Sequence, residues 1–240
     1  MIPRILAALF LAGCAGFAQD EPALTAEQAF KKIEEVVTKA KGARVQYAWE
    51  GTSSTDLAGK VEATGMVLIK EGNRTNLTAT ITERERTSEL KVVSDGTIVK
   101  TKLGPHRVLE CVVPKNFEAG LKLALHRLGA MQAVLIAHKV CMLEEEEQEE
   151  ALKLGKKPAV GDFRHGPDDG ESKTLLYKII PDGADSAAEV RLWYAPDTYR
   201  LVKRTITIKK PAESVFTEVY KEWTLDADLE NEQFRLPSVK

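Results

Sequence analysis

The sequence predicts an α+β protein that is mostly antiparallel β, with an N-terminal helix and a helical insertion between two groups of strands. Three observations support this class. Apolar residues recur at helical spacing soon after the N-terminus, they alternate with polar residues in two later stretches, and helical spacing returns between those stretches, at about residues 114–152. Because segregated helices and antiparallel strands bury their apolar faces by layering, we expect an α+β layered structure or a curved half-barrel around a helix.

The N-terminal helix is expected to begin after Thr25, a good N-cap residue that has Gln28 three positions later. Gly42 marks its end. The apolar residues that follow the helical period are Ala26, Ala29, Phe30, Ile33, Val36, Val37 and Ala40.

A period of two begins at Val45, where Val45, Tyr47 and Trp49 fall on one face of a predicted strand. Asp95-Gly96 lies between two apolar-rich runs and predicts a hairpin with a type I′ turn, which needs positive φ at both central residues. We expect the two groups of strands to form two antiparallel sheets. The further predicted strands are 61–69, 77–81, 90–93 and 98–99 in the first group, and 160–163, 175–180, 189–194, 201–208 and 215–223 in the second.

The helical insertion follows Pro114 and predicts a helical hairpin or a kinked helix hinged near Gly129. Polar residues interrupt its apolar pattern, which speaks against a transmembrane helix and favours packing on a sheet. The glutamate-rich run Glu144 to Glu150 is expected to be the solvated end of this region.

Residues 1–18 have the order of a secretory signal peptide: one cation, Arg4, an apolar run from Ile5 to Leu11, and small residues through Ala18. The run is far shorter than the roughly 20 residues that cross a bilayer. We therefore expect cleavage and a single mature domain at 19–240, with no transmembrane helix.

A second cleavage site competes with the first, because residues 11–14 form a lipobox that ends in Cys14. Cleavage there would remove residues 1–13 and leave a lipidated Cys14, and a fully modified lipoprotein cysteine anchors stably in a membrane. Both readings predict an exported protein, located in the periplasm or anchored at a membrane.

Composition and motifs exclude several classes of function. The 34 basic and 36 acidic residues give a formal net charge of −2, and the chain has no basic stripe, so we expect no nucleic-acid partner. The four histidines lack metal-ligand spacing, and no nucleophile elbow, phosphate loop or dinucleotide motif is present. We therefore expect a non-enzymatic protein without cofactor or metal. After export, Cys111 and Cys141 form either one disulfide or two buried thiols.

Four segments, in their order along the chain, resemble the LolA/LolB superfamily of lipoprotein-sorting proteins, as a divergent member. The resemblance spans nearly the whole mature chain and implies an incomplete, strongly curved antiparallel β-barrel. The inner face of such a barrel is apolar and covered by lid helices, and it holds acyl chains in transit through the periplasm. The segments are Gly-Met-Val-Leu-Ile-Lys at 65–70, Val-Ser-Asp-Gly-Thr at 93–97, Trp-Tyr-Ala-Pro-Asp-Thr at 193–198 and Phe-Arg-Leu-Pro at 234–237, which resembles a final strand.

The chain departs from the carriers after the first of these segments. The carriers have an Arg-Pro pair there, whose arginine latches the lid, whereas this chain has Glu71-Gly72. Arg74 is the nearest candidate to replace that arginine.

The resemblance implies a protein that binds lipid or lipoprotein acyl chains in a hydrophobic cleft. The alternative is an envelope sensor or scaffold that uses the same fold for contacts with a protein partner. Apolar residues stand on both faces of the second strand, Met66 and Leu68 opposite Val67 and Ile69, and the sequence leaves a hollow and a packed interior open. The candidate cleft residues are Trp49, Val67, Ile69, Leu77, Ile81, Leu121, Leu125, Met131 and Leu135.

Overall fold

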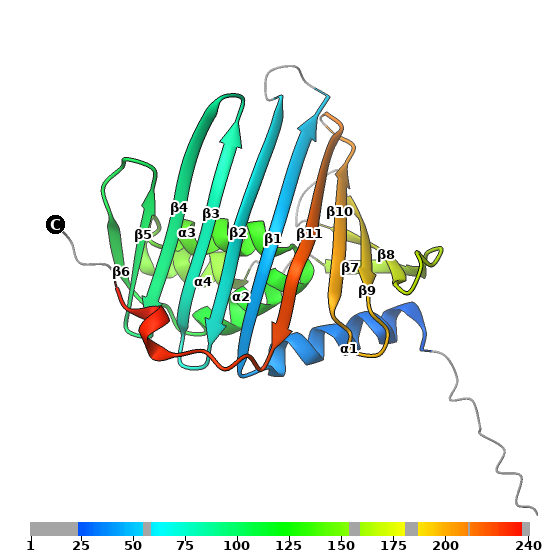
Figure 1. The fold of residues 1–240 in the computed structure, drawn as a ribbon, viewed down its shortest axis with the longest axis horizontal. Helices are drawn as coiled ribbons and strands as arrows, with labels where there is room; N and C mark the ends of the chain where they lie inside the picture. The colour runs from blue at the N-terminus through cyan, green and yellow to red at the C-terminus, as the bar shows by residue number, and fades with distance from the viewer. Residues whose placement is uncertain (1–23, 55–58, 154–158, 181–186, 211, 237–240) are drawn as a thin grey trace, which may run out of the picture.

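The structure is a computed structural model that describes residues 24–54, 59–153, 159–180, 187–210 and 212–236. The predicted signal peptide and Cys14 lie outside these residues. The described chain forms one open, curved, 11-stranded antiparallel sheet with helices on one face (Figure 1). The predicted α+β class is confirmed, with β6 and β7 as the two unpaired edges of the sheet.

The strands follow one another in space in the order β6-β5-β4-β3-β2-β1-β11-β10-β9-β8-β7. Their bounds are β1 Gly42–Ser53, β2 Lys60–Lys70, β3 Arg74–Glu83, β4 Arg86–Asp95, β5 Ile98–Leu103, β6 Leu109–Val112, β7 Ala159–His165, β8 Lys173–Ile180, β9 Ala188–Tyr194, β10 Leu201–Ile208 and β11 Ser214–Leu225. The helices are α1 Ala26–Lys39, α2 Phe117–Arg127, α3 Ala130–Val140, α4 Glu145–Lys153 and the short 3-10 helix η1 Asn231–Phe234.

The expectation of two separate sheets is wrong, because β1 pairs with β11 along its whole length. Val45 faces Trp223 and Ser53 faces Ser214 in this register, with one bulge at Gln46/Tyr47. The first and last strands thus join both meanders into one sheet. Pairing between ends of a chain leaves no local signal, which is why the sequence did not reveal it.

The predicted capping box at the start of α1 is present: the Gln28 backbone N–H donates to the Thr25 hydroxyl, and the Thr25 backbone N–H donates to the Gln28 side chain. The apolar stripe of α1 packs against α2, β7 and β8. Phe30 lies at its centre, with its ring centroid 4.9 Å from those of Phe163 and Tyr177. These contacts hold α1 under the curled β7–β8 end of the sheet.

The helical insertion covers the inner face of the sheet, where α3 contacts β1, β2, β3 and β4 (Figure 1). The predicted hinge near Gly129 is the corner between α2 and α3, with φ of 110° at Gly129. The glutamate-rich run forms the first turns of α4, a separate helix. No helix in the described ranges has both the length and the apolarity needed to cross a membrane.

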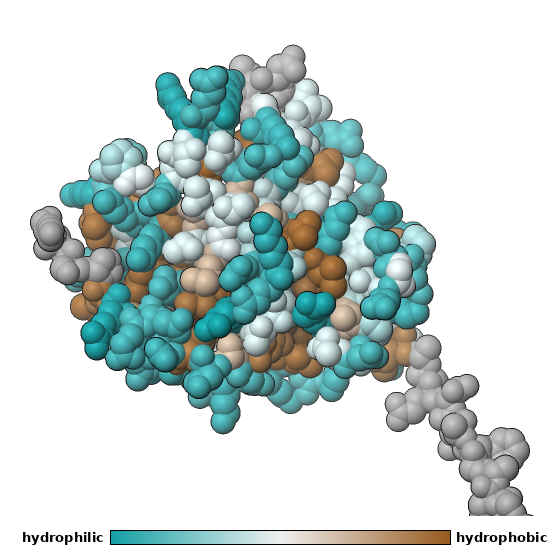
Figure 2. All heavy atoms as spheres, viewed as in Figure 1, coloured by the Kyte–Doolittle hydropathy of each residue, from teal (hydrophilic) through white to brown (hydrophobic). Residues whose placement is uncertain are grey.

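The C-terminal segment covers part of the outer face. Leu229 and Phe234 pack on Leu68, which points away from the main core. Phe234 lies in η1, so the final strand that the resemblance implied is a 3-10 helix instead. Figure 2 shows this outer face, on which hydrophilic side chains predominate and hydrophobic ones form smaller patches between them.

The hairpin at Asp95-Gly96 joins β4 to β5, but the type I′ turn is not what the structure contains. Only Gly96 has a positive φ, of 101°. The Asp95 carboxylate accepts hydrogen bonds from the backbone N–H groups of Thr97 at 2.8 Å and Ile98 at 3.0 Å. This Asx-type turn supplies the reversal with a single left-handed residue.

Candidate functional site

Six of the nine candidate cleft residues lie in one continuous buried cluster between the sheet and the helices. Each has at most 4% of its surface exposed. The side chains of α2 and α3 therefore fill the inner face of the sheet. The six are Val67 and Ile69 on β2, Leu77 on β3, Leu121 and Leu125 on α2, and Met131 on α3.

Trp49 and Ile81 lie at the rim of this cluster and are half-buried. Trp49 stacks on Phe216 with ring centroids 5.7 Å apart. Beside this pair, a cavity of about 20 Å³ opens between β1, β10, β11 and α3. That volume admits about one water molecule, whereas small-molecule pockets measure about 300–1,000 Å³.

Leu135 does not line the interior, and its place in the candidate cleft is corrected. Its side chain is 37% exposed, while Met131, Val134 and Ala137 of the same helix are buried. Each residue turns about 100° around a helix. Leu135 comes one residue after the buried Val134, so it lies outside the buried stripe of α3 and faces away from the sheet.

The corner between α2 and α3 is held to the sheet by a buried carboxylate. Glu218, on β11, is 3% exposed and accepts hydrogen bonds from the backbone N–H groups of Ala130 at 2.9 Å and Met131 at 2.8 Å. The Tyr220 hydroxyl donates to the same carboxylate. A carboxylate at this place satisfies the free N–H groups of the first turn of α3 and complements its dipole.

A buried guanidinium holds the preceding helix in the complementary way. Arg204, on β10, is 1% exposed and donates to the backbone carbonyls of Leu125, at 3.2 Å, and His126. These carbonyls belong to the last turn of α2, where a cation is favourable.

Arg204 and Glu218 are direct cross-strand neighbours on β10 and β11. One opposite-charge pair therefore caps the end of α2 and the start of α3. Gly129 lies between them, and a Cβ added there would come within 2.5 Å of a Glu218 carboxylate oxygen and 2.9 Å of an Arg204 nitrogen. We call the group of Gly129, Arg204, Glu218 and Tyr220 the Gly129 corner.

Arg204 and Glu218 were not among the residues predicted from the sequence. A signal was present, because Phe216, Glu218 and Tyr220 share one face of a period-two strand, as do Arg204, Ile206 and Ile208. A charged residue that takes the place of an apolar one on the buried face of a strand indicates a buried charge, which needs hydrogen-bonding or ionic partners.

Arg74 does not replace the carriers' latch arginine. Its guanidinium donates to the Asn231 side chain at 2.9 Å, in the C-terminal segment on the outer face. The fastening of the helices is instead provided by Arg204, on a strand of the second meander.

The other end of α3 is tied covalently. Cys141, directly after α3, forms a disulfide with Cys111 on the edge strand β6, with Cα atoms 5.3 Å apart. The described residues thus contain the predicted pair as a disulfide, and it joins the helical insertion to the sheet.

A second polar cluster joins α1 to the end of α2. Arg127 donates to the Glu34 carboxylate at 2.6 and 3.0 Å, and the His126 Nδ1 atom lies 3.3 Å from it. Burial raises the pKa of Glu34, but the adjacent His126 and the hydrogen bonds from Arg127 outweigh it and lower the pKa to about 2. Burial lowers the pKa of His126 to about 4, so its imidazole is neutral at pH 7. In the part of the chain that the structure describes, no cluster of three or more His, Cys, Asp or Glu side chains is arranged to hold a metal.

Several solved structures are similar to this chain. A LolA superfamily protein from Nitrosomonas europaea is 16% identical, with 89% of this chain and 99% of that chain covered and a TM-score of 0.36. LprF from Mycobacterium bovis is 12% identical over 82% and 92% of the two chains, with a TM-score of 0.40. A DUF1329 family protein from Desulfovibrio piger is 9% identical over 89% and 98%, with a TM-score of 0.35.

No family model matches the sequence, and no curated protein matches it. These solved structures share 9–16% sequence identity with this chain.

Proposed function

We propose that this protein is a non-enzymatic binding protein of the bacterial cell envelope, which holds a lipid or the acyl chains of a lipoprotein between the sheet and helices α2 and α3. The observation that carries the proposal is the different attachment of the two ends of α3. Its C-terminal end is tied to β6 by the Cys111–Cys141 disulfide, whereas its N-terminal end is held at the Gly129 corner by hydrogen bonds.

This arrangement favours a hinged lid. An 11-residue helix is roughly 16 Å long, so a modest rotation about the disulfide end would move the Gly129 end by several ångströms. The surface exposed by that rotation is apolar and includes Val67, Ile69 and Leu77 on the sheet side. An acyl chain would replace the side chains of Leu121, Leu125 and Met131 against it. In this proposal the structure is the closed state, and its interior is filled by the lid itself.

The ligand must supply the free energy of opening. Opening breaks the hydrogen bonds at the Gly129 corner, and each hydrogen bond to a charged group is worth about 1.5–3 kcal/mol. A ligand shifts the equilibrium only by its differential affinity for the open state. Burial of the acyl chains would offset this cost, because removing apolar surface from water stabilises by about 25 cal/mol per Å².

The test is saturable binding of a fluorescent fatty acid, displaced by unlabelled palmitate. Glu218→Gln should bind the probe more tightly than the native protein, because the closed state is weakened. Each 1.4 kcal/mol removed from closure tightens the apparent Kd about tenfold. The matched control is Glu222→Gln, a glutamate on the same strand outside the corner, whose affinity should equal that of the native protein. Absence of probe uptake by both the native protein and Glu218→Gln would refute the proposal.

The filled interior supports a second candidate, an envelope sensor or scaffold that binds a protein partner. Here the cavity beside Trp49, of about 20 Å³, is the supporting observation. Affinity capture from envelope extracts separates the two functions. A stable protein partner without extractable lipid supports the scaffold, whereas lipid without a partner supports the carrier.

The site of action follows from the N-terminus. We propose export to the periplasm, with membrane anchoring if Cys14 is lipidated. Mass spectrometry of the mature N-terminus tests this, since a free start at Gln19 excludes the anchor.

A further inference from the structure

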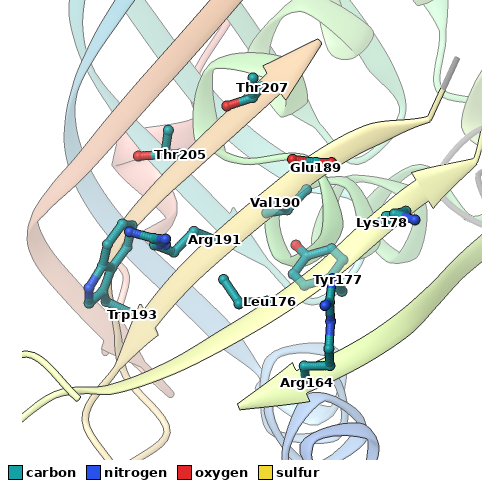
Figure 3. A pocket seen from close by; sticks show the side chains of 10 residues that line it. All are labelled: Arg164, Leu176, Tyr177, Lys178, Glu189, Val190, Arg191, Trp193, Thr205 and Thr207. Carbon is teal, nitrogen blue, oxygen red and sulfur yellow. The ribbon is translucent and has the colours of Figure 1, made fainter. Parts of the chain in front are cut away.

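The outer face of the sheet carries a groove of about 400 Å³ across β7, β8, β9 and β10 (Figure 3). It lies on the opposite side of the sheet from the helices. Its size is within the range of small-molecule pockets. It is lined by Arg164, Leu176, Tyr177, Lys178, Glu189, Val190, Arg191, Trp193, Thr205 and Thr207.

Cations without acidic partners concentrate at this groove. Arg191 and Lys203 flank the Trp193 ring, with the guanidinium carbon 5.7 Å and the ammonium nitrogen 4.9 Å from its centroid. Neither cation forms an ion pair with any residue in the described ranges. Trp193 is 9% exposed, so the two cations cover the ring and are held in place by it.

Of the other charges that line the groove, Glu189 and Lys178 form ion pairs, and Arg164 interacts electrostatically with Asp162 and Glu189. Glu189 binds Lys209 at 2.8 Å, and Lys178 binds Asp162 at 2.7 Å. The single acidic lining residue is therefore already neutralised, although the formal charge of the whole chain is −2. A local excess of positive charge on a weakly acidic protein indicates a place for an anion.

The strand register places Arg164 and Arg191 in one row across the groove, and their side chains extend to opposite sides of Leu176 (Figure 3). Arg164 faces Leu176 on β8, and Leu176 faces Arg191 on β9, so the two arginines flank the shorter Leu176 in one row. Neighbouring strands are about 4.8 Å apart, which places the arginine Cα atoms roughly 10 Å from each other. Thr205 continues the row on β10 and adds a hydroxyl donor.

We propose that this groove binds a phosphate ester, with Arg191 as its guanidinium ligand beside Lys203 and with Arg164 as a further cation of the same groove. Guanidinium forks match both carboxylates and phosphates, but this groove offers more donors than the two oxygens of a carboxylate require. Thr205 and Thr207 supply hydroxyls, and Lys203 adds an ammonium beside Trp193. The phosphate belongs either to a soluble phosphorylated molecule or to a phospholipid headgroup.

The experiment measures calorimetric binding of glycerol 3-phosphate to the native protein, with succinate as a dicarboxylate of similar charge. We expect saturable binding of glycerol 3-phosphate, weakened at least about tenfold in Arg191→Gln, as the loss of a charged hydrogen bond implies. Lys91→Gln is the control, because Lys91 is an exposed cation on β4, six strands from β9. Its affinity should remain within about twofold of the native value.

Flotation with vesicles of phosphatidylglycerol or phosphatidylcholine identifies the source of the phosphate. Flotation with phosphatidylglycerol that is lost in Arg191→Gln, without binding of glycerol 3-phosphate, assigns the groove to a membrane headgroup. Binding of glycerol 3-phosphate assigns it to a soluble ester. The proposal is overturned if native protein binds neither probe, if succinate binds as tightly as glycerol 3-phosphate, or if Lys91→Gln weakens binding as much as Arg191→Gln. Uptake of the fatty-acid probe by Arg191→Gln should equal that of the native protein, which keeps this test separate from that of the inner cleft.

Discussion

Replacement of Glu218 by glutamine is the sharpest test of the Gly129 corner. The carboxylate is 3% exposed, accepts two backbone hydrogen bonds from α3 and one from Tyr220, and lies across from the buried Arg204. Each buried hydrogen bond to a charged group that is lost costs about 1.5–3 kcal/mol. A glutamine amide oxygen carries no charge and accepts at most two of the three hydrogen bonds. We therefore expect a loss of about 3 kcal/mol in the free energy of unfolding.

Urea unfolding followed by circular dichroism measures this loss, and hydrogen exchange shows where it acts. The amides of Ala130 and Met131 should exchange faster in Glu218→Gln, whereas amides in the centre of β2 should change less. Glu222→Gln should stay within about 0.5 kcal/mol of native stability, as most surface substitutions do. A Glu218→Gln protein that unfolds like this control, with unchanged exchange at Ala130, would refute the role assigned to the corner.

Three further changes test the attachment of the helices. Gly129→Ala should lower the free energy of unfolding by about 2 kcal/mol or more in urea titrations, because φ is 110° and the new Cβ would contact the buried charges. Cys111→Ser/Cys141→Ser removes a disulfide that spans a sequence separation of 30, and it should lower the free energy of unfolding by about 3.5 kcal/mol. Equal stability of the oxidised and double-serine proteins would contradict a formed disulfide. Burial lowers the pKa of His126 from 6.5 in the unfolded chain to about 4 in the folded protein, so the unfolded chain binds a proton at a higher pH. The free energy of unfolding should therefore fall by about 3 kcal/mol as the pH drops from 6.5 through 4. Unfolding of His126→Asn against pH should lack this slope, whereas the exposed His106→Asn should retain it.

The periodic elements could be predicted because each is specified locally. The capping box and apolar stripe of α1, and the alternation in most strands, appear in the structure within a few residues of their expected bounds. The pairing of β1 with β11 could not be predicted, since it joins residues that are distant in the chain. The short strand β6 was missed because its four residues, Leu109–Val112, are too few to show an alternation.

The candidate site was predicted less completely than the fold. Apolar residues in the correct register placed six of the nine candidates in the buried inner cluster. Periodicity indicates only that a face is buried, and it does not distinguish protein side chains from a ligand as the groups that cover that face. Leu135 was misplaced for the simpler reason that one helical position separates the buried from the exposed side of α3. Arg204 and Glu218 were overlooked although the alternation of β10 and β11 places both charges inward.

The two opposite charges buried at the Gly129 corner bear on function. Two buried charges bring a large desolvation cost, and well-packed apolar residues of similar volume often stabilise a protein equally well or better. Stability alone therefore does not explain Arg204 and Glu218. Their hydrogen bonds depend on direction, so they hold α2 and α3 in one orientation and are lost together once the corner moves. Apolar contacts between the same helices and the sheet, in contrast, could be exchanged for acyl chains with little change in surface chemistry. A lid with a covalent end, an apolar body and a polar free end would close in a defined position and would still release the inner face to a ligand.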